Sequence, residues 1–281
     1  MQKKVLEHKS FDIAQTQNKV LSIRVSPDGL YFVVTDEGKD NLVLHTSRII
    51  DPARGGLDIL VEEMKNGDLL GRPFLKTNVF YETEQYTLVP KFELEKTRAE
   101  EIAKTCFGEE KMKGMVVMCD EVSFTNSSVV YTVLDSDLER IKSYFPDARI
   151  FHHVHAPLYG AMTTAKTKDS YALININSFF FDIIVVENGA IRLCGGYRYK
   201  STEEFLYYVL GITSTLHIDP YALKVLVVGE VDEYSSIVKN LNKYLMTYYP
   251  DSIKGVTLKK PFSKVDNFQY YFTLFLSSVC V

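Results

Sequence analysis

The stretch Val20-Leu-Ser-Ile-Arg-Val-Ser26 alternates apolar and polar side chains and ends at the turn Pro27-Asp-Gly29. Leu21, Ile23 and Val25 fall on one face, and the polar residues between them fall on the other. A period of two is typical of a β-strand with one buried and one solvated face. The stretch therefore predicts a half-buried strand that leads into a hairpin.

This strand opens a meander of three strands, and the pattern returns in the second half of the chain. The first meander comprises residues 20–26, 30–34 and 41–45, with a turn over residues 36–40. The second comprises residues 171–176, 180–186 and 190–193, with the hairpin turn Glu187-Asn-Gly189. Two halves that open alike indicate a structural repeat. Opening meanders argue against a Rossmann domain, in which strands and helices alternate from the start.

Helices and further strands follow each meander, which predicts an α/β fold. Helices are expected at 57–65, 94–106, 136–144 with Asp135 as N-cap, 157–164, after the capping box Ser201-Thr-Glu-Glu204, at 234–248 and within 268–281. Strands are expected at 78–81, 86–89, 113–119, 128–133, 148–155, 224–228 and 254–256. The 281 residues fit two lobes, residues 1–156 with an inserted α/β subdomain at about 68–150, and residues 157–281.

Composition and charge exclude several classes of protein. A chain with 46% hydrophobic and 24% charged residues is globular, and its net charge of −4 attracts neither nucleic acid nor anionic lipid. Four cysteines without a C-x-x-C pair fit a reducing compartment, and the polar start lacks a secretory signal. The apolar run 268–281 is too short to cross a bilayer. We expect a cytoplasmic protein without membrane insertion or nucleic-acid partner.

The usual nucleotide and catalytic motifs are absent: no G-x-G-x-x-G, G-x-x-x-x-G-K-[ST], G-x-S-x-G or H-E-x-x-H occurs. His152, His153 and His155 form the one histidine cluster, but a zinc site needs three or four ligands and we expect structural roles. Cys194 precedes two glycines, and we expect a buried thiol at the end of a strand. The pairs Glu62-Glu63, Glu100-Glu101 and Glu203-Glu204 are expected to be solvated.

The repeated meander resembles the actin-like ATPase superfamily, in particular degenerate members that serve as cytoplasmic subunits of pilus-assembly and type II secretion machines. In that superfamily an Asp-x-Gly loop in each half's first hairpin faces the nucleotide phosphates, and a later Gly-Gly turn holds the adenosine. The resemblance implies a two-lobed actin-like, ribonuclease H-like fold. It places the two phosphate loops at Arg24-Val25-Ser26 and Asn175-Ile176-Asn177, and the adenosine turn at Gly229-Glu230.

A narrower resemblance covers most of the chain. The stretch Tyr81-Glu-Thr-Glu-Gln-Tyr-Thr-Leu-Val-Pro90, the region of Tyr144-Phe-Pro146 and His152, and a Leu-x-Leu at Leu274 and Leu276 resemble an uncharacterised bacterial family, Domain of Unknown Function family 3822. This family implies no established activity. The resemblance supports the fold and leaves the function open.

The three loops depart from the superfamily's pattern in ways that disfavour nucleotide chemistry. Mg²⁺ prefers carboxylate oxygen, but the first loop has Arg24, which repels the ion, and the second has the neutral Asn175. Ser26 and Asn177 place side chains where a backbone must approach a phosphate closely, and Glu230 adds negative charge at the adenosine turn. We expect neither Mg-ATP binding nor another cofactor or metal, and no catalytic residue.

Two other roles for the loop and surface residues stay open. Arg24 is either a solvated or ion-paired strand residue, or one half of an internal pair with Asp182 or Glu230. Asn175 and Asn177 also suit a cap at the end of a strand. The 18 tyrosines and 17 phenylalanines can supply a binding surface, although most are expected to lie in the core.

The leading hypothesis is a non-catalytic interaction or scaffold protein of actin-like fold with degenerate nucleotide loops and an unidentified protein partner; a homodimer is compatible with this reading. The alternative is an ATP-dependent phosphotransferase or ATPase of the same fold with rearranged ligands. A third hypothesis, an enzyme of unrelated chemistry between the lobes, calls for a site with strongly shifted pKa values. The sequence does not identify the partner or the process.

Overall fold

The structure is a computed structural model that describes residues 2–37, 40–48, 55–165, 170–232, 234–254, 256 and 258–281. The chain divides into two compact units. Unit 1 comprises Met1–His155, Thr257–Val265 and Ser277–Val281, and unit 2 comprises Ala156–Val256 and Asp266–Leu276. The lobe limits expected from the sequence, 1–156 and 157–281 with an insertion at about 68–150, stay predictions.

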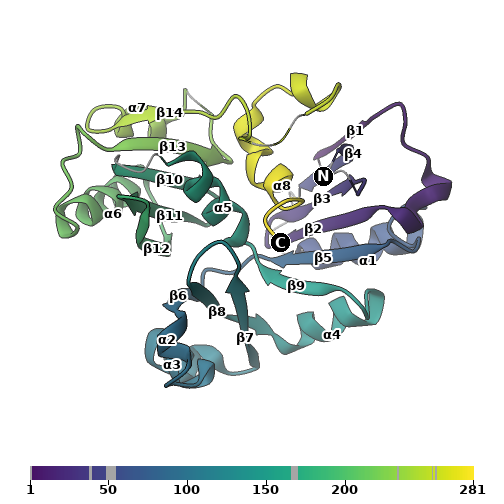
Figure 1. Ribbon diagram of the computed structural model, residues 1–281, viewed down its shortest axis with the longest axis horizontal. Helices are drawn as coiled ribbons and strands as arrows, with labels where there is room; N and C mark the ends of the chain where they lie inside the picture. Colours follow the sequence, from purple (N-terminus) through teal and green to yellow (C-terminus); the bar gives the residue numbers. More distant parts are fainter. Residues whose placement is uncertain are drawn as a thin grey trace. The chain divides into compact units, whose positions relative to one another are not determined.

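Unit 1 is built on a six-stranded mixed sheet (Figure 1). Its strand order is β1-β4-β3-β2-β5-β9, with β1 Gln2–Glu7, β2 Val20–Ser26, β3 Gly29–Thr35, β4 Asn41–Arg48, β5 Lys76–Tyr81 and β9 Arg149–His152. The predicted meander is confirmed as antiparallel β2-β3-β4, while β5 and β9 join in parallel. Sequence analysis missed β1, which pairs with β4 at the sheet edge, and Gly38 and Lys39 of the expected turn lie outside the described residues.

The prediction that β2 is half-buried is wrong, because its polar face is buried as well. Ser22 is 0% exposed, Arg24 8% and Ser26 3%. Ser22 donates its hydroxyl to the carbonyl of Ser277, in the C-terminal segment that belongs to unit 1. Buried polar groups persist where partners satisfy them, so period-two alternation here marks two buried faces of different polarity.

Helix α1 (Gly56–Asn66) packs on β2 and β3 through Leu57, Ile59 and Leu60, which are buried. Its first residue, Gly56, leaves no room for a side chain, since a Cβ there would lie 2.1 Å from the carbonyl oxygen of Gly29. This close approach sets the start of α1 directly on the turn between β2 and β3. Two short 3₁₀ helices, Ile13–Asn18 and Phe262–Lys264, complete this part of unit 1.

A small antiparallel sheet of order β6-β8-β7 lies between β5 and β9 in the chain. Its elements are β6 Tyr86–Pro90, α2 Lys91–Leu94, α3 Ala99–Phe107, the 3₁₀ helix Glu109–Met112, β7 Met115–Val122, β8 Ser127–Leu134 and α4 Asp135–Tyr144. Helix α3 covers one face through a cluster of Val89, Ala103 and Val130 (Figure 1). The helix expected over 94–106 is instead α2 and α3, separated by the extended backbone of Arg98, and Asp135 lies inside α4 rather than capping it.

Unit 2 contains a five-stranded mixed sheet of order β12-β11-β10-β13-β14 (Figure 1). Its elements are α5 His155–Thr164, β10 Ser170–Ile176, β11 Phe180–Glu187, β12 Ala190–Arg198, α6 Thr202–Thr215, β13 Lys224–Gly229, α7 Ser236–Leu241 and β14 Met246–Tyr248. The second meander, β10-β11-β12, is confirmed. The Ser201 cap of α6 is confirmed as well, and the Glu204 side chain accepts from the backbone N–H of Lys200. In the core of unit 2 the sheet packs against α6 and α7 through Phe181, Phe205, Val209 and Leu241, among others.

Two helices expected near the C-terminus are wrong in length. The helix over 234–248 stops at Leu241, because residues 246–248 pair with β13 as the parallel strand β14. The run 268–281 forms only the 3₁₀ helix Phe268–Tyr270 and α8 Phe272–Leu276, both in unit 2. Gly255 of the strand expected over 254–256 lies outside the described residues. In the described part of the chain, no helix is both long and apolar enough to cross a bilayer.

The side chain of His45 on β4 is buried in unit 1 beside charged groups. Its ring stacks on Phe32 at 4.4 Å, its Nε2 lies 2.7 Å from the hydroxyl of Ser47, and Glu63 is 3.9 Å away. Burial lowers the pKa of His45 to about 4, an effect that Glu63 opposes and Lys3 reinforces. The folded protein therefore holds this imidazole neutral near pH 6, where the unfolded chain binds a proton.

We expect the free energy of unfolding to fall as the pH drops from 6.5 to 4, because the unfolded state takes up the proton that folded His45 refuses. His45→Gln keeps a polar contact to Ser47 and removes the titration, so its pH profile should be shallower by up to roughly 3 kcal/mol across this range. Urea unfolding at a series of pH values measures this. His217→Asn, at an exposed residue with a left-handed φ of 56°, controls for loss of a histidine. Equal profiles for wild type and His45→Gln would contradict the assignment.

Candidate functional site

The first phosphate-loop position, Arg24-Val25-Ser26, forms the end of β2. Because β5 runs parallel to β2 with Val25 opposite Tyr81, the next residue, Glu82, arrives beside this end, and its N–H donates to the carbonyl of Val25 at 3.0 Å. The Glu82 carboxylate then meets two side chains of β2. Its Oε1 lies 2.9 Å from the Ser26 hydroxyl, and its Oε2 lies 3.5 Å from Arg24 Nε.

This cluster is almost wholly buried, and its charged groups lie close together. Burial raises the pKa of Glu82, and Asp28 adds to that effect, while Arg24 and His153 oppose it. The Ser26 hydroxyl also lies 2.5 Å from Asp28, yet a hydroxyl donates only one proton. The hydroxyl can therefore donate to only one of the two carboxylates, Asp28 or Glu82, at a time.

Arg24 is packed rather than solvated. Its guanidinium lies 4.3 Å above the ring of Tyr31, where a cation is attracted to the aromatic face. Its ion-pair partner in unit 1 is Glu82, which the sequence did not indicate. The expected pairing with Asp182 or Glu230 would join the two units and stays a prediction.

A cavity of about 290 Å³ adjoins this turn within unit 1, lined by Ser26 and Glu82 on one side and by the start of α1 on another. The start of a helix attracts anions, but here an acidic side chain of the chain occupies it. Asp58 accepts a hydrogen bond from the N–H of Gly55 at 3.0 Å and is ion-paired with Arg140 at 2.8 Å. The cavity thus lies beside acidic side chains, which disfavours a phosphate.

The second phosphate-loop position lies in unit 2 and has a different chemistry. Asn175, the last but one residue of β10, lies opposite Asp182 of β11, and Asn177 begins the hairpin turn. Both amides donate to one carboxylate oxygen of Asp182, Asn175 at 2.9 Å and Asn177 at 3.3 Å. All three side chains are buried, and Asp182 is 0% exposed. The loop is closed by side-chain hydrogen bonds of its own residues.

The adenosine-turn position, Gly229-Glu230, adjoins the same loop because β13 runs parallel to β10 with Gly229 opposite Ile176. Gly229 has a φ of +89°, and a Cβ there would lie 2.2 Å from the carbonyl oxygen of Ile176. Glu230 donates its N–H to that same carbonyl at 2.6 Å, and its carboxylate accepts from the Ser178 hydroxyl at 2.7 Å. The structure thus brings the second and third loop positions together, with a carboxylate bridging the two turns.

The histidine cluster lies in unit 1, where β9 ends. His152 Nε2 contacts the carbonyl of Thr83 at 2.9 Å, and its Nδ1 accepts from the N–H of Val154 at 3.2 Å. Both ring nitrogens are thereby used, and burial holds the pKa of His152 well below its ordinary value. His155 lies 3.7 Å from Asp120; burial lowers the pKa of His155 to about 4 and raises that of Asp120 to about 6. These contacts suit a neutral, structural cluster.

Among the described residues, no group of three or more His, Cys, Asp or Glu side chains is arranged to hold a metal ion. Cys194 was expected at the end of a strand as a buried thiol. It lies in the middle of β12 opposite Ile184 and is half-buried, because Gly195 and Gly196 continue the strand. Burial raises the pKa of Cys119, so that thiol is not activated.

Residues 8–247 match the family described as "Protein of unknown function (DUF3822)". The chain belongs to this family. No curated protein matches it. Among solved structures, a Bacteroides thetaiotaomicron protein with actin-like ATPase fold and unknown function is 18% identical, with a TM-score of 0.78 over 86% of this chain and 94% of the other.

Two further structures extend the comparison. The PilM-PilN type IV pilus biogenesis complex contains a chain that is 10% identical, with a TM-score of 0.59 over 93% of this chain and 97% of the other. Ethanolamine utilization protein EutJ from Carboxydothermus hydrogenoformans is 11% identical, with a TM-score of 0.48 over 93% and 89%. The likenesses at TM-scores of 0.78 and 0.59 show that this DUF3822 protein has the actin-like ATPase fold, with two mixed-sheet lobes and a small antiparallel sheet.

Glu82 was the main residue that sequence reasoning missed. It lies 56 positions beyond Ser26 and follows a strand whose parallel pairing with β2 no local pattern reveals. One signal was available, since the polar face of β2 carries an arginine that needs an acidic partner if it is buried. Asp182 was considered only as a partner of Arg24, and its hydrogen bonds from Asn175 and Asn177 were not foreseen.

A double-mutant cycle tests the pair of Arg24 and Glu82. Arg24→Met leaves a buried carboxyl without its cation, and we expect a loss of about 3 kcal/mol in the free energy of unfolding. Adding Glu82→Gln should recover part of this loss, with a coupling energy of about 1–3 kcal/mol. The exposed pair of Arg192 and Glu187, treated in the same way, should couple by less than about 1 kcal/mol. Additive losses at Arg24 and Glu82 in urea unfolding would refute the buried pair.

Gly229→Ala tests the turn of unit 2. A side chain there is strained by the positive φ and collides with the carbonyl of Ile176, so we expect at least about 2 kcal/mol of destabilisation. Gly211→Ala, in the exposed middle of α6 with open space around it, should instead stabilise by up to about 1 kcal/mol. Thermal unfolding of both variants measures the two signs, and a neutral Gly229→Ala would show that the turn relaxes.

Proposed function

We propose that this DUF3822 protein works through protein contacts as a non-catalytic scaffold, and that its actin-like fold no longer carries nucleotide chemistry. The observation that supports this most directly is that both phosphate-loop positions are occupied by side-chain networks of the chain itself. Arg24, Ser26 and Glu82 fill the first, and Asn175, Asn177 and Asp182 fill the second.

The network in unit 1 opposes a nucleotide by its charge. A phosphate needs backbone N–H groups and positive charge within reach, whereas the β2–β3 turn presents Ser26 flanked by the carboxyl groups of Asp28 and Glu82. Binding would require Arg24 to leave Glu82, and an unpaired buried carboxylate is costly. The cluster is therefore more stable as a part of the core than as a ligand site.

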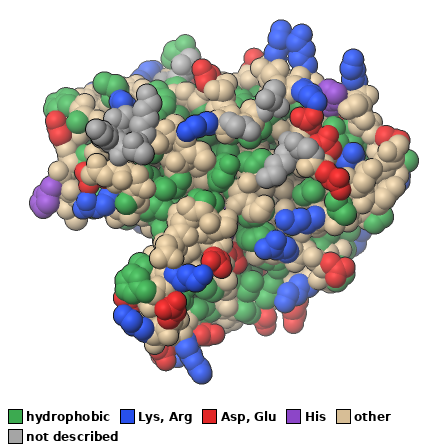
Figure 2. Space-filling view, viewed as in Figure 1, with side chains coloured by type: hydrophobic (Ala, Val, Ile, Leu, Met, Phe, Trp, Pro, Cys, Tyr) green, Lys and Arg blue, Asp and Glu red, His purple; other side chains and the backbone are tan. Residues whose placement is uncertain are grey.

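A role in protein contacts agrees with the surface and with one structural relative. On the face shown in Figure 2, acidic and basic side chains are interspersed, and the net charge is −4, so the proposed partner is a protein rather than nucleic acid. The PilM chain, similar in fold at a TM-score of 0.59, is described in complex with PilN. By analogy we place the action of this chain in the cytoplasm, in binding another protein, and a homodimer is one form of such a contact.

One observation favours the alternative, an ATPase or phosphotransferase with rearranged ligands. Asp182 supplies a carboxylate directly beside Asn175, where the fold's metal-binding aspartate is absent. If the two asparagines released it, this group could hold Mg²⁺, alone or through water. In the alternative Asp182 replaces the missing loop aspartate from the neighbouring strand.

Calorimetric titration with Mg-ATP tests the proposal, and we expect no binding at micromolar concentrations. The same titration of Asp182→Asn and Asn175→Ala identifies the residues responsible if heat is released. Micromolar binding that disappears in both variants would overturn the proposal and establish the alternative. Mg²⁺ without nucleotide is the matched control, since it separates a metal site from a nucleotide site.

A further inference from the structure

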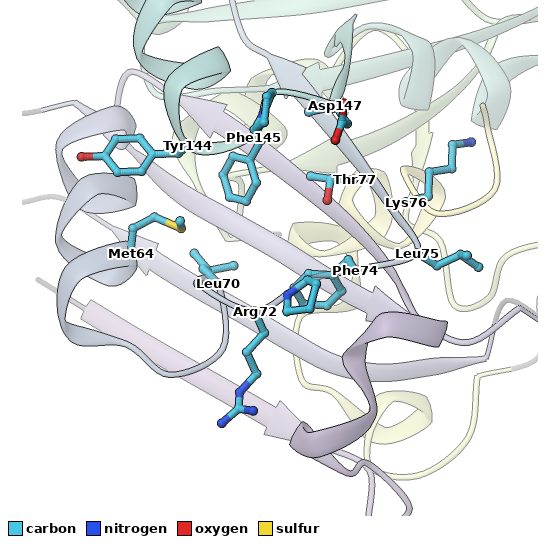
Figure 3. A pocket seen from close by; sticks show the side chains of 14 residues that line it. Met64, Leu70, Arg72, Phe74, Leu75, Lys76, Thr77, Tyr144, Phe145 and Asp147 are labelled. Carbon is cyan, nitrogen blue, oxygen red and sulfur yellow. The ribbon is translucent and has the colours of Figure 1, made fainter.

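A groove of about 480 Å³ lies in unit 1, at the opposite end of β2 from the phosphate-loop position of that unit (Figure 3). One wall comes from the end of α1 and the segment that follows it, and the other from the residues between α4 and β9. The side chains that converge in Figure 3 are largely apolar, with Leu70, Phe74 and Phe145 at the centre. The volume lies within the range of sites that bind small molecules or peptide side chains.

The groove exposes apolar surface at its rim. Leu75 is 55% exposed, although its backbone is held in place by a hydrogen bond from its N–H to the carbonyl of Lys19 at 2.9 Å. Leu70 and Phe145 are 2% and 8% exposed and form a fixed apolar floor. A rigid apolar pocket with an exposed leucine at its edge suits an apolar anchor from a partner, because ordering the site costs little.

Arg72 supplies an exposed cation to the groove, which Lys76 and Asp147 also line. Its Nε donates to the carbonyl of Asp68 at 3.1 Å, and within the described residues it makes no ion pair. In Figure 3 the side chain of Arg72 points out of the groove, away from Phe145. A segment whose apolar side chain fills the pocket would carry its neighbouring residue past this guanidinium, whose outer nitrogens suit a carboxylate.

The start of β5 in the six-stranded sheet indicates which backbone conformation a segment bound in the groove would adopt. β9 pairs with β5 only from Asn78 onward, whereas Lys76 and Thr77 of β5 line the groove. The chain before β9 turns aside, with the N–H of Ala148 donating to the carbonyl of Phe145. The groove therefore lies where β9 would run if it were extended backwards along β5. A segment in extended conformation fits that line and can use main-chain hydrogen bonds.

We propose that this groove docks a short extended segment of a partner protein, with an apolar anchor side chain next to an Asp or Glu. The anchor contacts Leu70, Phe74 and Phe145, and the carboxylate pairs with Arg72. This rests on the proposed function only in that both assign the chain a role in protein contacts. The two tests are separate, because the nucleotide titration does not probe the groove.

The experiment selects ligands from a phage-displayed library of random dodecapeptides against the full-length protein. We expect enrichment of peptides in which an aromatic or aliphatic residue adjoins Asp or Glu. A synthetic, fluorescently labelled copy of an enriched peptide is then titrated by polarisation against wild type and variants. Arg72→Glu should weaken its binding at least tenfold, because it replaces a charge-assisted hydrogen bond with repulsion.

Two further variants distinguish binding in the groove from a nonspecific effect of surface charge. Gly71→Trp places a ring at a groove-lining residue where an added Cβ meets nothing closer than 3.8 Å, so it should block binding without unfolding the protein. Lys142→Glu makes a charge change of the same size on the exposed side of α4, outside the groove, and should bind as wild type does. Circular dichroism melts confirm that all variants fold.

Three outcomes would overturn the proposal. The first is a selection that enriches no acidic-apolar peptide. The second is a peptide that binds Gly71→Trp or Arg72→Glu as tightly as wild type, which would place its site elsewhere. The third is a wild-type dimer in sedimentation that Gly71→Trp converts to monomer, since the groove would then be occupied by a second copy of the chain.

Discussion

Three polar side chains of β2, those of Ser22, Arg24 and Ser26, point into the interior of unit 1, and each needs a partner there. The C-terminal segment supplies one at Ser277, and Glu82 supplies the others from the end of the neighbouring parallel strand. The need for these hydrogen-bond and ion-pair partners places Glu82 at the end of β5 and the C-terminal segment against β2. This arrangement also fills the first phosphate-loop position, so under the proposed function one requirement of the core accounts for the absence of nucleotide chemistry there.

In unit 2 the corresponding position, the end of the first meander strand, carries different side chains. A strand end, a hairpin and a parallel neighbour recur, but two amides share the oxygen of Asp182 where unit 1 sets a guanidinium and a hydroxyl on Glu82. The two solutions have in common a buried carboxyl group held by donors from the first strand and the turn that follows it. A repeat visible in the backbone thus need not be visible in the residues, which is why the halves share a meander without an obvious sequence identity.

The meanders were predictable because each strand and turn lies within a few residues of its partner and shows in the local pattern. Contacts between distant segments could not be predicted in this way. β1 pairs with β4 at the edge of the sheet, and Glu82 lies beside β2 only because β5 pairs with that strand. The helix expected through Tyr248 failed for a related reason. Ile237, Leu241 and Leu245 have helical spacing and all join the core, yet residues after Leu241 do so through a turn and the strand β14. The spacing of apolar residues predicts which side chains are buried, but a helix is not the only backbone conformation that can bury them.

Residues 277–281 belong to unit 1 although the chain reaches them only after passing through unit 2. During synthesis, Ser22 therefore gains its acceptor at Ser277 only after unit 2 has been made. Such threading couples the assembly of the two units in time, although each has its own core. A ribosome-bound chain stopped at residue 276 would leave the Ser22 hydroxyl without this acceptor, so the last polar group of β2 to be satisfied depends on a segment made after unit 2.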